Sequence, residues 1–342
     1  MAAALGVLAS CGSVKSGEDA IAASRDSKVV VAYVTSWSDV MPDPQCMTHI
    51  NYAFGHVNES FNGVKIDNEE RLKQIVDLKK QKPDLKVLLS IGGWGSGRFS
   101  EMAANDEYRR AFAVDCERVV EEFALDGIDI DWEYPTSSMA NISSSPDDTE
   151  NFTLLMQDIR AAIGNEKELT LATVASARYI DFKAILPSVD FVNIMAYDMA
   201  SAPKHHSALY PSGHSGDITS DGAVTAHLKA GVPPSKLVMG MPFYGRGGDG
   251  YPSFQDYNKV GNTDTQYTEK WDEVAQVPYL ADKNDTLVFG FENPRSLAIK
   301  CQYILDKDLL GGMYWDYSGD NEQGDLRRTV CLLYTSDAAD DK

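Results

Sequence analysis

The stretch DGIDIDWEYP, residues 126–135, decides the fold of this 342-residue chain. Successive side chains of a β-strand point to opposite faces, so a strand here has one acidic and one apolar face. The acidic face carries Asp129, Asp131 and Glu133. The apolar face carries Ile128, Ile130 and Trp132. We expect the apolar face to pack on outer helices and the three carboxyl groups, roughly 6 to 7 Å apart along the strand, to point inward.

Three inward carboxyl groups are costly in a strand with a purely structural role. A buried acid is unfavourable when ionised and unpaired, and like charges raise one another's pKa. Coupled acids let one carboxyl group stay protonated near neutral pH and act as a general acid, and Glu133 lies at the open end of the strand. A metal site, a solvated acidic loop or a chance pattern are the alternatives. The interleaved apolar residues favour a buried strand, and no ligand-spaced residues surround it.

Eight short apolar or alternating segments alternate with segments of helical spacing. The expected strands are 29–34, 49–55, 86–93, 127–133, 168–176, 191–198, 236–245 and 311–317. The expected helices are 68–82, 106–125, 148–163, 221–230 and 294–308. Eight such repeats predict an α/β protein with a (β/α)8 TIM barrel, whose active site lies at the C-terminal ends of the strands. The interval 247–310 predicts an irregular excursion, with a short or absent insertion between the seventh and eighth strands.

The charge balance restricts the binding partners. The chain has 31 Lys and Arg against 51 Asp and Glu, a formal net charge of −20, which disfavours nucleic acid and anionic lipid because both require a basic surface. A neutral or cationic partner is expected, and the 10% aromatic content suits stacking on sugar faces. No glycine-rich phosphate loop and no ligand-spaced Cys or His cluster is present in the sequence, so no cofactor and no metal are expected.

The two chain ends differ in composition from the rest. Residues 1–27 predict a signal segment with a lipobox, LASC at 8–11, followed by a tether, so that Cys11 would carry a lipid anchor. An ordinary frayed N-terminus is the alternative. Residues 28–334 form the predicted barrel, and the acidic stretch 335–342 predicts a disordered or non-native tail. No apolar stretch reaches the length of a membrane span. Export to a bacterial periplasm or cell surface is expected.

Several motifs resemble family 18 of the glycoside hydrolases, the chitinase-like family. The acidic strand matches the family's DxxDxDxE signature at Asp126, Asp129, Asp131 and Glu133. SIGGW at 90–94 looks like the family's third-strand element, MAYD at 195–198 like the sixth, FYGR at 243–246 like the seventh and GGMYW at 311–315 like the eighth. The resemblance spans residues 29–333. Within the signature, Asp126 precedes the acidic strand itself and is expected to fix the turn before Gly127.

The resemblance implies a retaining, substrate-assisted hydrolysis of β-1,4-linked N-acetylglucosamine polymers. Glu133 would protonate the glycosidic oxygen, and the substrate's own acetamido carbonyl would attack the anomeric carbon to give an oxazolinium ion. Asp131 would bind the acetamido N–H, while Asp129, with Ser90 nearby, would hold Asp131 and share its proton. Tyr197 would donate a hydrogen bond to the acetamido oxygen.

The same resemblance implies a set of sugar-binding residues. Asp198 would hold the distorted sugar, and Trp315 would stack beneath it. The other expected substrate-binding residues are Tyr33, Phe54, Ser90, Gly93, Trp94, Tyr134, Met195, Tyr244 and Arg246. Packing in the barrel core is an equal alternative for Phe54, Met195 and Tyr244, and a structural ion pair is the alternative for Arg246.

Two other functions fit the same motifs. An endo-β-N-acetylglucosaminidase acting on the chitobiose core of N-glycans would use the same chemistry. A non-catalytic chitin-binding lectin would retain the cleft but lack the acid, whereas Glu133 and Asp131 are both present. The short interval between the last two strands predicts a shallow cleft, which favours endo-type or short-oligomer cleavage.

Overall fold

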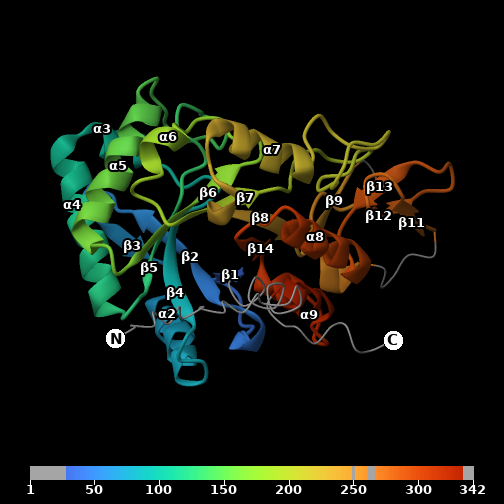
Figure 1. The fold of residues 1–342 in the computed structure, drawn as a ribbon, viewed down its shortest axis with the longest axis horizontal. Coiled ribbons are helices and arrows are strands. Elements are labelled where there is room, and N and C mark those ends of the chain that lie inside the picture. The colour runs from blue at the N-terminus through green and yellow to red at the C-terminus, as the bar shows by residue number, and fades with distance from the viewer. Residues whose placement is uncertain (1–27, 249–250, 261–265, 334–342) are drawn as a thin grey trace, which may run out of the picture.

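The computed structural model describes residues 28–248, 251–260 and 266–333. Eight parallel strands form its centre (Figure 1). They are β1 (Val29–Thr35), β2 (His49–Val57), β4 (Lys86–Gly92), β5 (Gly127–Asp131), β6 (Glu168–Val174), β7 (Phe191–Met195), β8 (Leu237–Pro242) and β14 (Gly311–Trp315). Pairing of β1 with both β14 and β2 closes the sheet, and β3 (Val64–Ile66) adds an antiparallel edge to β2. The predicted TIM barrel is confirmed.

Helices cover the outside of the barrel. Those expected from the sequence are α2 (Glu69–Val76), α4 (Asp106–Glu122), α5 (Asp148–Ile163), α7 (Ser220–Ala230) and α8 (Pro294–Asp306). The structure adds α3 (Phe99–Ala104), α6 (Phe182–Ile185) and α9 (Asp325–Val330). These added helices have only 4 to 6 residues, too few for a periodic apolar pattern. The 3-10 turns are η1 (Pro44–Cys46), η2 (Asp77–Lys80), η3 (Pro234–Lys236), η4 (Tyr257–Lys259), η5 (Tyr317–Gly319) and η6 (Cys331–Leu333).

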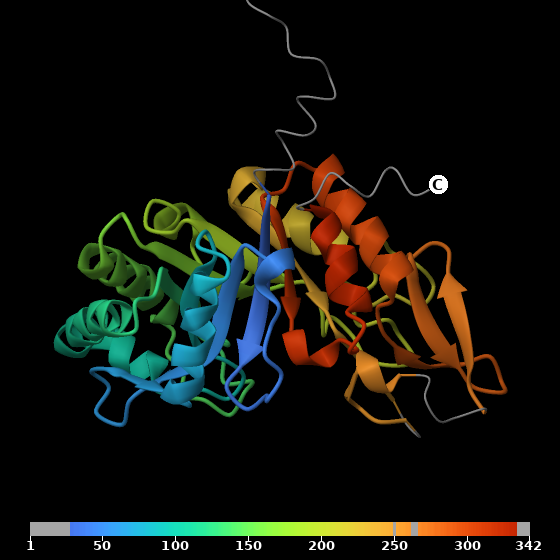
Figure 2. The same ribbon diagram turned by 90° about the horizontal axis from the view of Figure 1, so that it is seen from below.

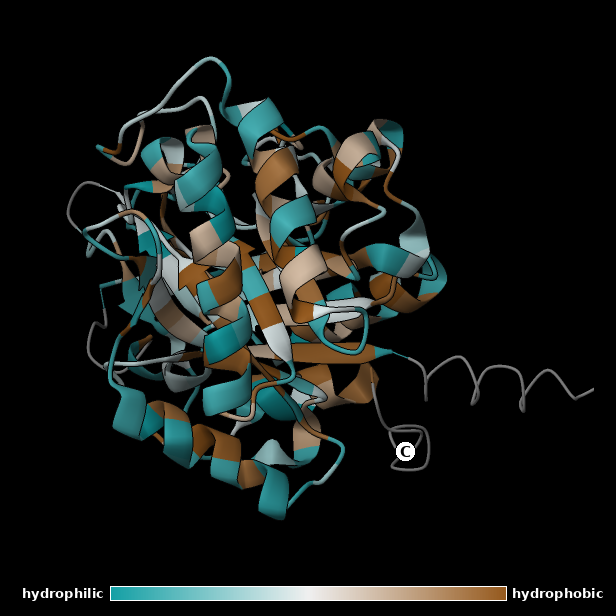
Figure 3. Cartoon of the chain, turned by 90° about the vertical axis from the view of Figure 1, so that its left-hand side faces the viewer, coloured by the Kyte–Doolittle hydropathy of each residue, from teal (hydrophilic) through white to brown (hydrophobic). Residues whose placement is uncertain are grey.

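The helix α4 shows how the outer layer forms. Asn105 caps its N-terminus, accepting hydrogen bonds from the backbone N–H groups of Glu107 and Tyr108. Its buried stripe of Phe112, Cys116, Val119 and Val120 faces the strands. Figure 3 shows apolar colours on the central strands and alternating hydrophilic and apolar bands along the outer helices, as expected for amphipathic helices.

The strand β5 has the two faces predicted for it. Ile128 and Ile130 are fully buried in the outer core, where the ring of Trp132 stacks on Phe99 of α3 at 5.3 Å and 15°. Asp129 and the residues that follow it on the other face point into the barrel. A separate inner apolar cluster fills the interior: Val31, Tyr33, Ala53, Phe54, Phe191, Val238 and Met313.

The described part of the interval between β8 and α8 contains a sheet, so the prediction of an irregular excursion is wrong. Five antiparallel strands form it: β9 (Tyr244–Gly247), β10 (Gln255–Asp256), β11 (Thr268–Asp272), β12 (Val277–Ala281) and β13 (Leu287–Gly290). These strands are only 2 to 5 residues long, too short for their alternation to stand out in the sequence. Figure 2 shows this sheet as a lobe beside the barrel.

Other sequence predictions concern the chain ends and the cysteines. The lipid anchor at Cys11 and the tail at 335–342 lie outside the described residues. None of the helices in the described ranges is long and apolar enough to cross a membrane. Among the described cysteines, Cys116 and Cys301 are buried and pack as small apolar side chains. Asp126 accepts hydrogen bonds from Lys79 and from the backbone of Val87, which confirms its structural role.

Candidate active site

Asp129 is the centre of a buried hydrogen-bond network inside the barrel. Strand register places Ser90 of β4 and Thr170 of β6 directly beside it. The Oδ2 atom of Asp129 accepts hydrogen bonds from Ser90 at 2.8 Å and from the Tyr33 hydroxyl at 2.9 Å. The Oδ1 atom accepts from Thr170 at 2.6 Å and from the Asn193 amide at 3.2 Å. Burial raises the pKa of Asp129, and these four donors oppose the shift.

Asp131 lies one step further along the same face and is nearly devoid of partners. It is buried, and its Oδ1 atom makes no hydrogen bond within the described part of the chain. Burial, followed by the charges of Glu133 and Asp129, raises the pKa of Asp131 well above its usual range. The four donors on Asp129 do not include Asp131. The shared proton between these two acids stays a prediction.

Glu133 follows the end of β5 and lines a cavity at the C-terminal ends of the barrel strands. Only 9% of its surface is exposed. Burial raises the pKa of Glu133 to about 7; a hydrogen bond with Tyr134 opposes this shift, and the charge of Asp198 adds to it. A carboxyl group with this pKa is protonated below neutral pH and can both donate and accept a proton near pH 7.

The cavity has a volume of about 1010 Å³. Twelve of the predicted site residues line it: Tyr33, Phe54, Trp94, Asp131, Glu133, Tyr134, Met195, Tyr197, Asp198, Tyr244, Arg246 and Trp315. Non-proline cis peptide bonds join Ala53 to Phe54, Glu133 to Tyr134 and Trp315 to Asp316. Phe54 and Met195 also pack in the inner core, so the core packing considered for them is confirmed and their contact with substrate stays a prediction. The other three predicted residues, Asp129, Ser90 and Gly93, are not part of the cavity wall.

Gly93 acts through its backbone. Its φ is +92°, and a Cβ atom there would lie 2.6 Å from the ring of Phe54. Only glycine allows this close approach in that backbone conformation. The Gly93 N–H also donates to the carbonyl oxygen of Asp131 at 2.9 Å. Gly93 therefore positions Phe54 and the main chain of Asp131.

Aromatic side chains form the floor of the cavity. Trp315 lies 5.5 Å from Phe54 in a stacked arrangement, and 5.6 Å from Tyr33. Among the described residues, the Tyr197 hydroxyl has only a weak acceptor, the sulfur of Met313 at 3.9 Å. Burial, followed by the charge of Asp131, raises the pKa of Tyr197 well above its usual range, so the hydroxyl stays protonated. It is available to donate to a ligand.

Asp198 and Arg246 form a bidentate ion pair on the cavity wall. Arg246 donates from Nε to Oδ1 at 2.6 Å and from Nη2 to Oδ2 at 2.5 Å. Burial raises the pKa of Asp198, but Arg246 and the nearby His206 outweigh it and hold the pKa well below its usual range. Asp198 therefore remains ionised, and Arg246 is both an ion-pair partner and a wall residue.

Sequence reasoning missed several residues of the site. Trp37, Met139 and Phe254 line the cavity with large exposed surfaces, 64%, 65% and 42%. Trp37 comes two residues after β1, and this position at the C-terminal end of a strand was a usable signal. Thr170 and Asn193 were detectable as inward positions of strands β6 and β7 at the depth of Asp129. Phe254 lies in the insertion, where the sequence offered no such signal.

The arrangement defines a hydrolase of the glycosidase class. It combines an acid with a pKa near 7, a buried carboxyl partner and a cavity with an aromatic floor. Among the described residues, no group of three or more His, Cys, Asp or Glu side chains could hold a metal ion. The chain belongs to Glycosyl hydrolases family 18, whose family model matches residues 29–320, and it is a chitinase-like glycoside hydrolase.

Known proteins of this family resemble the chain over most of its length. Chitinase A1 of Niallia circulans is 30% identical over 415 residues, which cover 90% of this chain and 58% of that protein. Chitotriosidase-1 of Mus musculus is 31% identical, with coverage of 86% and 74%. The solved structure of a family 18 N-acetylglucosaminidase from Paenibacillus barengoltzii is 33% identical, with a TM-score of 0.82 and coverage of 90% and 99%.

Proposed function

We propose that this protein cleaves β-1,4 linkages of N-acetylglucosamine polymers with retention, by substrate-assisted catalysis. The carrying observation is the pair of adjacent acids in the cavity: Glu133, whose pKa is about 7, and Asp131, which is buried without a hydrogen-bond partner for Oδ1 within the described residues. The remaining carboxyl group that lines the described cavity, Asp198, is held by Arg246. A neighbouring acetamido group of the substrate supplies the nucleophile instead.

Glu133 transfers its proton to the glycosidic oxygen as the bond to the anomeric carbon breaks. The acetamido carbonyl oxygen attacks the same carbon and forms an oxazolinium ion, while the leaving sugar departs as a neutral alcohol. Glu133, now a carboxylate, takes a proton from a water molecule while the water oxygen bonds to the anomeric carbon. The bond between that carbon and the acetamido oxygen breaks, which restores the neutral acetamido group. Two inversions give net retention, and the acid regains its starting protonation state.

The two polar groups below the sugar orient the acetamido group. The free Oδ1 of Asp131 accepts its N–H, which offsets the positive charge of the oxazolinium ion. The Tyr197 hydroxyl, whose partner among described residues is only a thioether, donates to the acetamido oxygen. Trp315 provides the stacking face for the same sugar, and the Asp198–Arg246 pair faces its edge. All five side chains line one cavity.

A product profile distinguishes the modes of cleavage. Exposed rings on separate loops extend the cavity beyond the acid: Trp37 contacts Trp315, and Trp94 contacts Tyr134. This favours internal cleavage of N-acetylchitohexaose to dimers, trimers and tetramers. Monomer release alone would instead favour the N-acetylglucosaminidase activity named for the Paenibacillus protein. Release of a high-mannose glycan from a glycoprotein would favour the endo-β-N-acetylglucosaminidase alternative, and binding without any product would indicate a lectin.

An oxazoline-mimicking thiazoline tests the substrate-assisted route. Such a compound presents the ring atoms of the intermediate to Asp131 and Tyr197, so we expect competitive inhibition that is stronger than that by N-acetylglucosamine, by roughly 10². Initial rates on N-acetylchitohexaose over a range of inhibitor concentrations give the inhibition constant. Unchanged rates at saturating thiazoline would contradict the mechanism while leaving a glycosidase in place.

The pH profile reports the protonation of Glu133. Because the acid must be protonated and its pKa is raised to about 7, kcat/KM is expected to fall about tenfold per pH unit above pH 7. The charge of Asp198 contributes to this shift, so Asp198→Asn is expected to move the falling limb to lower pH. Rates measured between pH 4 and 9 check both expectations. A falling limb already near the ordinary glutamate pKa would contradict the assignment.

A further inference from the structure

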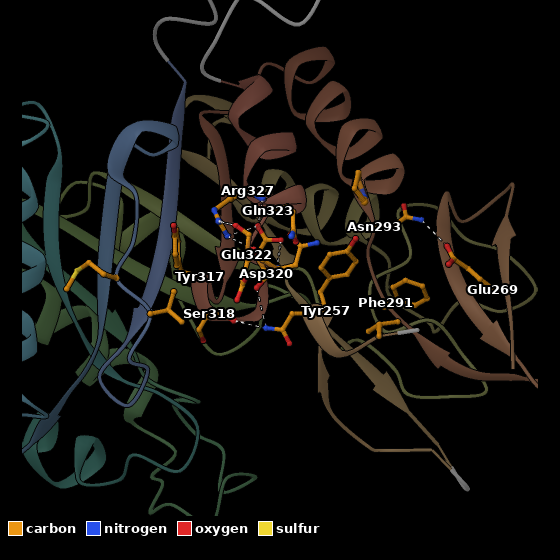
Figure 4. Close-up of a pocket in the computed structure, with 16 residues that line it drawn as sticks. Tyr257, Glu269, Phe291, Asn293, Tyr317, Ser318, Asp320, Glu322, Gln323 and Arg327 are labelled. Atoms are coloured by element: carbon orange, nitrogen blue, oxygen red, sulfur yellow. Dashed lines mark hydrogen bonds and ion pairs between the residues drawn. The ribbon is translucent and has the colours of Figure 1, made fainter. Parts of the chain in front are cut away.

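A second cavity of about 1010 Å³ lies on the flank of the molecule, between the barrel and the insertion sheet (Figure 4). Its wall comes from the loop after β1, from η4, from the start of α8 and from the segment between η5 and α9. No residue is shared between this wall and that of the catalytic cavity. We refer to it as the flank cavity.

The flank cavity and the catalytic cavity are neighbours. Three chain segments contribute to both: 37–41, 254–258 and 315–318. In each segment one end lines the catalytic cavity, as Trp37, Phe254 and Trp315 do. The other end lines the flank cavity, as Met41, Tyr257 and Tyr317 do. A polymer held in one cavity therefore has the second one close by on the same side of the barrel.

The charges of the flank cavity exclude an anionic ligand. Arg327 is the only cation among the described residues that line it, and its guanidinium is already engaged. It donates to Asp320 at 3.2 Å and to the carbonyl oxygens of Asn321 and Glu322 at 2.9 and 3.1 Å, and it lies over the ring of Tyr317. Asp320 accepts four hydrogen bonds that hold the start of α9. Neither member of this ion pair is free for a ligand.

The remaining groups suit a neutral polyhydroxylated ligand. The ring of Tyr257 is half-buried in the cavity, and its hydroxyl forms no hydrogen bond with the described residues. Burial raises its pKa to about 12, so the hydroxyl is a neutral donor and acceptor. Glu322 and Gln323 line the cavity with exposed side chains that are unpaired within the described structure. Met41, which is exposed, adds an apolar side chain to the cavity wall.

We propose that the flank cavity is a second, non-catalytic saccharide-binding site that stacks a neutral N-acetylglucosamine unit on Tyr257. A sugar presents an apolar face to an aromatic ring and hydroxyls to carboxylate and amide groups, and the flank cavity offers both. This site anchors a polymer chain beside the catalytic cavity and raises the local concentration of cleavable linkages. This second site depends on the proposed function in one respect only, which is the identity of the sugar.

Binding of N-acetylchitotetraose to the Glu133→Gln chain tests the proposal, because slow hydrolysis leaves the ligand intact. Calorimetric titration is expected to show two classes of site. Tyr257→Ala in this background weakens one class roughly tenfold, and Trp315→Ala weakens the other. A double variant, Glu322→Ala with Gln323→Ala, changes exposed side chains only and weakens the same class as Tyr257→Ala. Tyr210→Ala, an exposed tyrosine outside both cavities, is the matched control.

The outcomes separate the two proposals. A single site that is lost with Trp315→Ala and untouched by both flank variants overturns the second site and leaves the proposed function standing. A single site lost with the flank variants contradicts the catalytic cavity instead, and no binding contradicts both. Tighter binding of the tetramer of glucosamine, reversed by salt, would overturn a site for neutral sugar. Tyr257→Ala in the active chain is expected to leave kcat on the tetramer unchanged and to lower activity on insoluble chitin.

Discussion

Glu133→Gln is expected to lower kcat on N-acetylchitohexaose by a factor of roughly 10² to 10⁴, the contribution typical of a general acid. Glutamine keeps the size of the side chain and its place at the end of β5, but it has no proton of suitable acidity for the glycosidic oxygen. Trp315, Tyr197 and Arg246, which line the same cavity and are proposed to contact the sugar, are unchanged in this variant. We therefore expect KM to change much less than kcat.

Two measurements make this result specific to proton transfer. Glu150→Gln changes an exposed acid on α5 and should leave kcat unaltered. Thermal melting at pH 8 reports whether the variant is folded. Because burial raises the pKa of Glu133, the unfolded chain releases the Glu133 proton at a lower pH than the folded chain does. The free energy of unfolding of the parent therefore falls as the pH rises toward 7. Glutamine at position 133 does not titrate, so the variant does not lose this stability. Its melting temperature should be no lower than that of the parent. Activity within tenfold of the parent would contradict the role of Glu133.

The sequence specified the barrel because its strands and helices carry strong periodic patterns. The strand β5 is the clearest case: alternation alone places Ile128 and Ile130 outside and Asp129 inside, and the structure agrees. Burial in the barrel then determines which of these acids have raised pKa values. The depth of each acid follows from its position along the strand, so Asp129 is enclosed by four donors whereas Glu133 reaches the cavity.

Other features depend on contacts between distant segments and carry no local pattern. The partners of Asp129 come from four other strands, and only the barrel register brings Tyr33, Ser90, Thr170 and Asn193 to one level. The insertion strands β9 to β13 are short and interrupted, so their sheet forms through pairing that a single-sequence pattern does not reveal. Residues that the insertion brings to the cavity, such as Phe254, were missed for the same reason.

The amino-acid composition also gave no sign of a buried ion pair outside the active site. Glu292 and Lys300 carry no motif that marks them in the sequence, yet both side chains are fully enclosed. Lys300 on α8 forms an ion pair with Glu292 and donates to the carbonyl oxygen of Ser207 at 2.6 Å. The Ser207 hydroxyl donates to the same Glu292 oxygen at 2.6 Å. The pair thus ties α8 and the end of the insertion to the long loop that follows β7.

Lys300→Met is therefore expected to destabilise the fold by about 3 to 5 kcal/mol, because it leaves the Glu292 carboxylate buried without its cation. Methionine fits the apolar path of the lysine side chain, so the loss reports the unpaired charge rather than a cavity. The melting temperature should fall by about 10 °C. Lys307→Met is the matched control, since its pair with Asp221 is exposed and worth about 1 kcal/mol or less.

A second substitution distinguishes the charge from the packing. Glu292→Gln combined with Lys300→Met removes both charges but keeps an acceptor for the Ser207 hydroxyl, so the double variant should recover most of the stability lost by the single one. The difference between the two variants, measured by urea unfolding, is the cost of a buried carboxylate without its partner. Equal losses in both would assign the effect to packing around α8, and a loss below about 1 kcal/mol in Lys300→Met would show that water reaches Glu292.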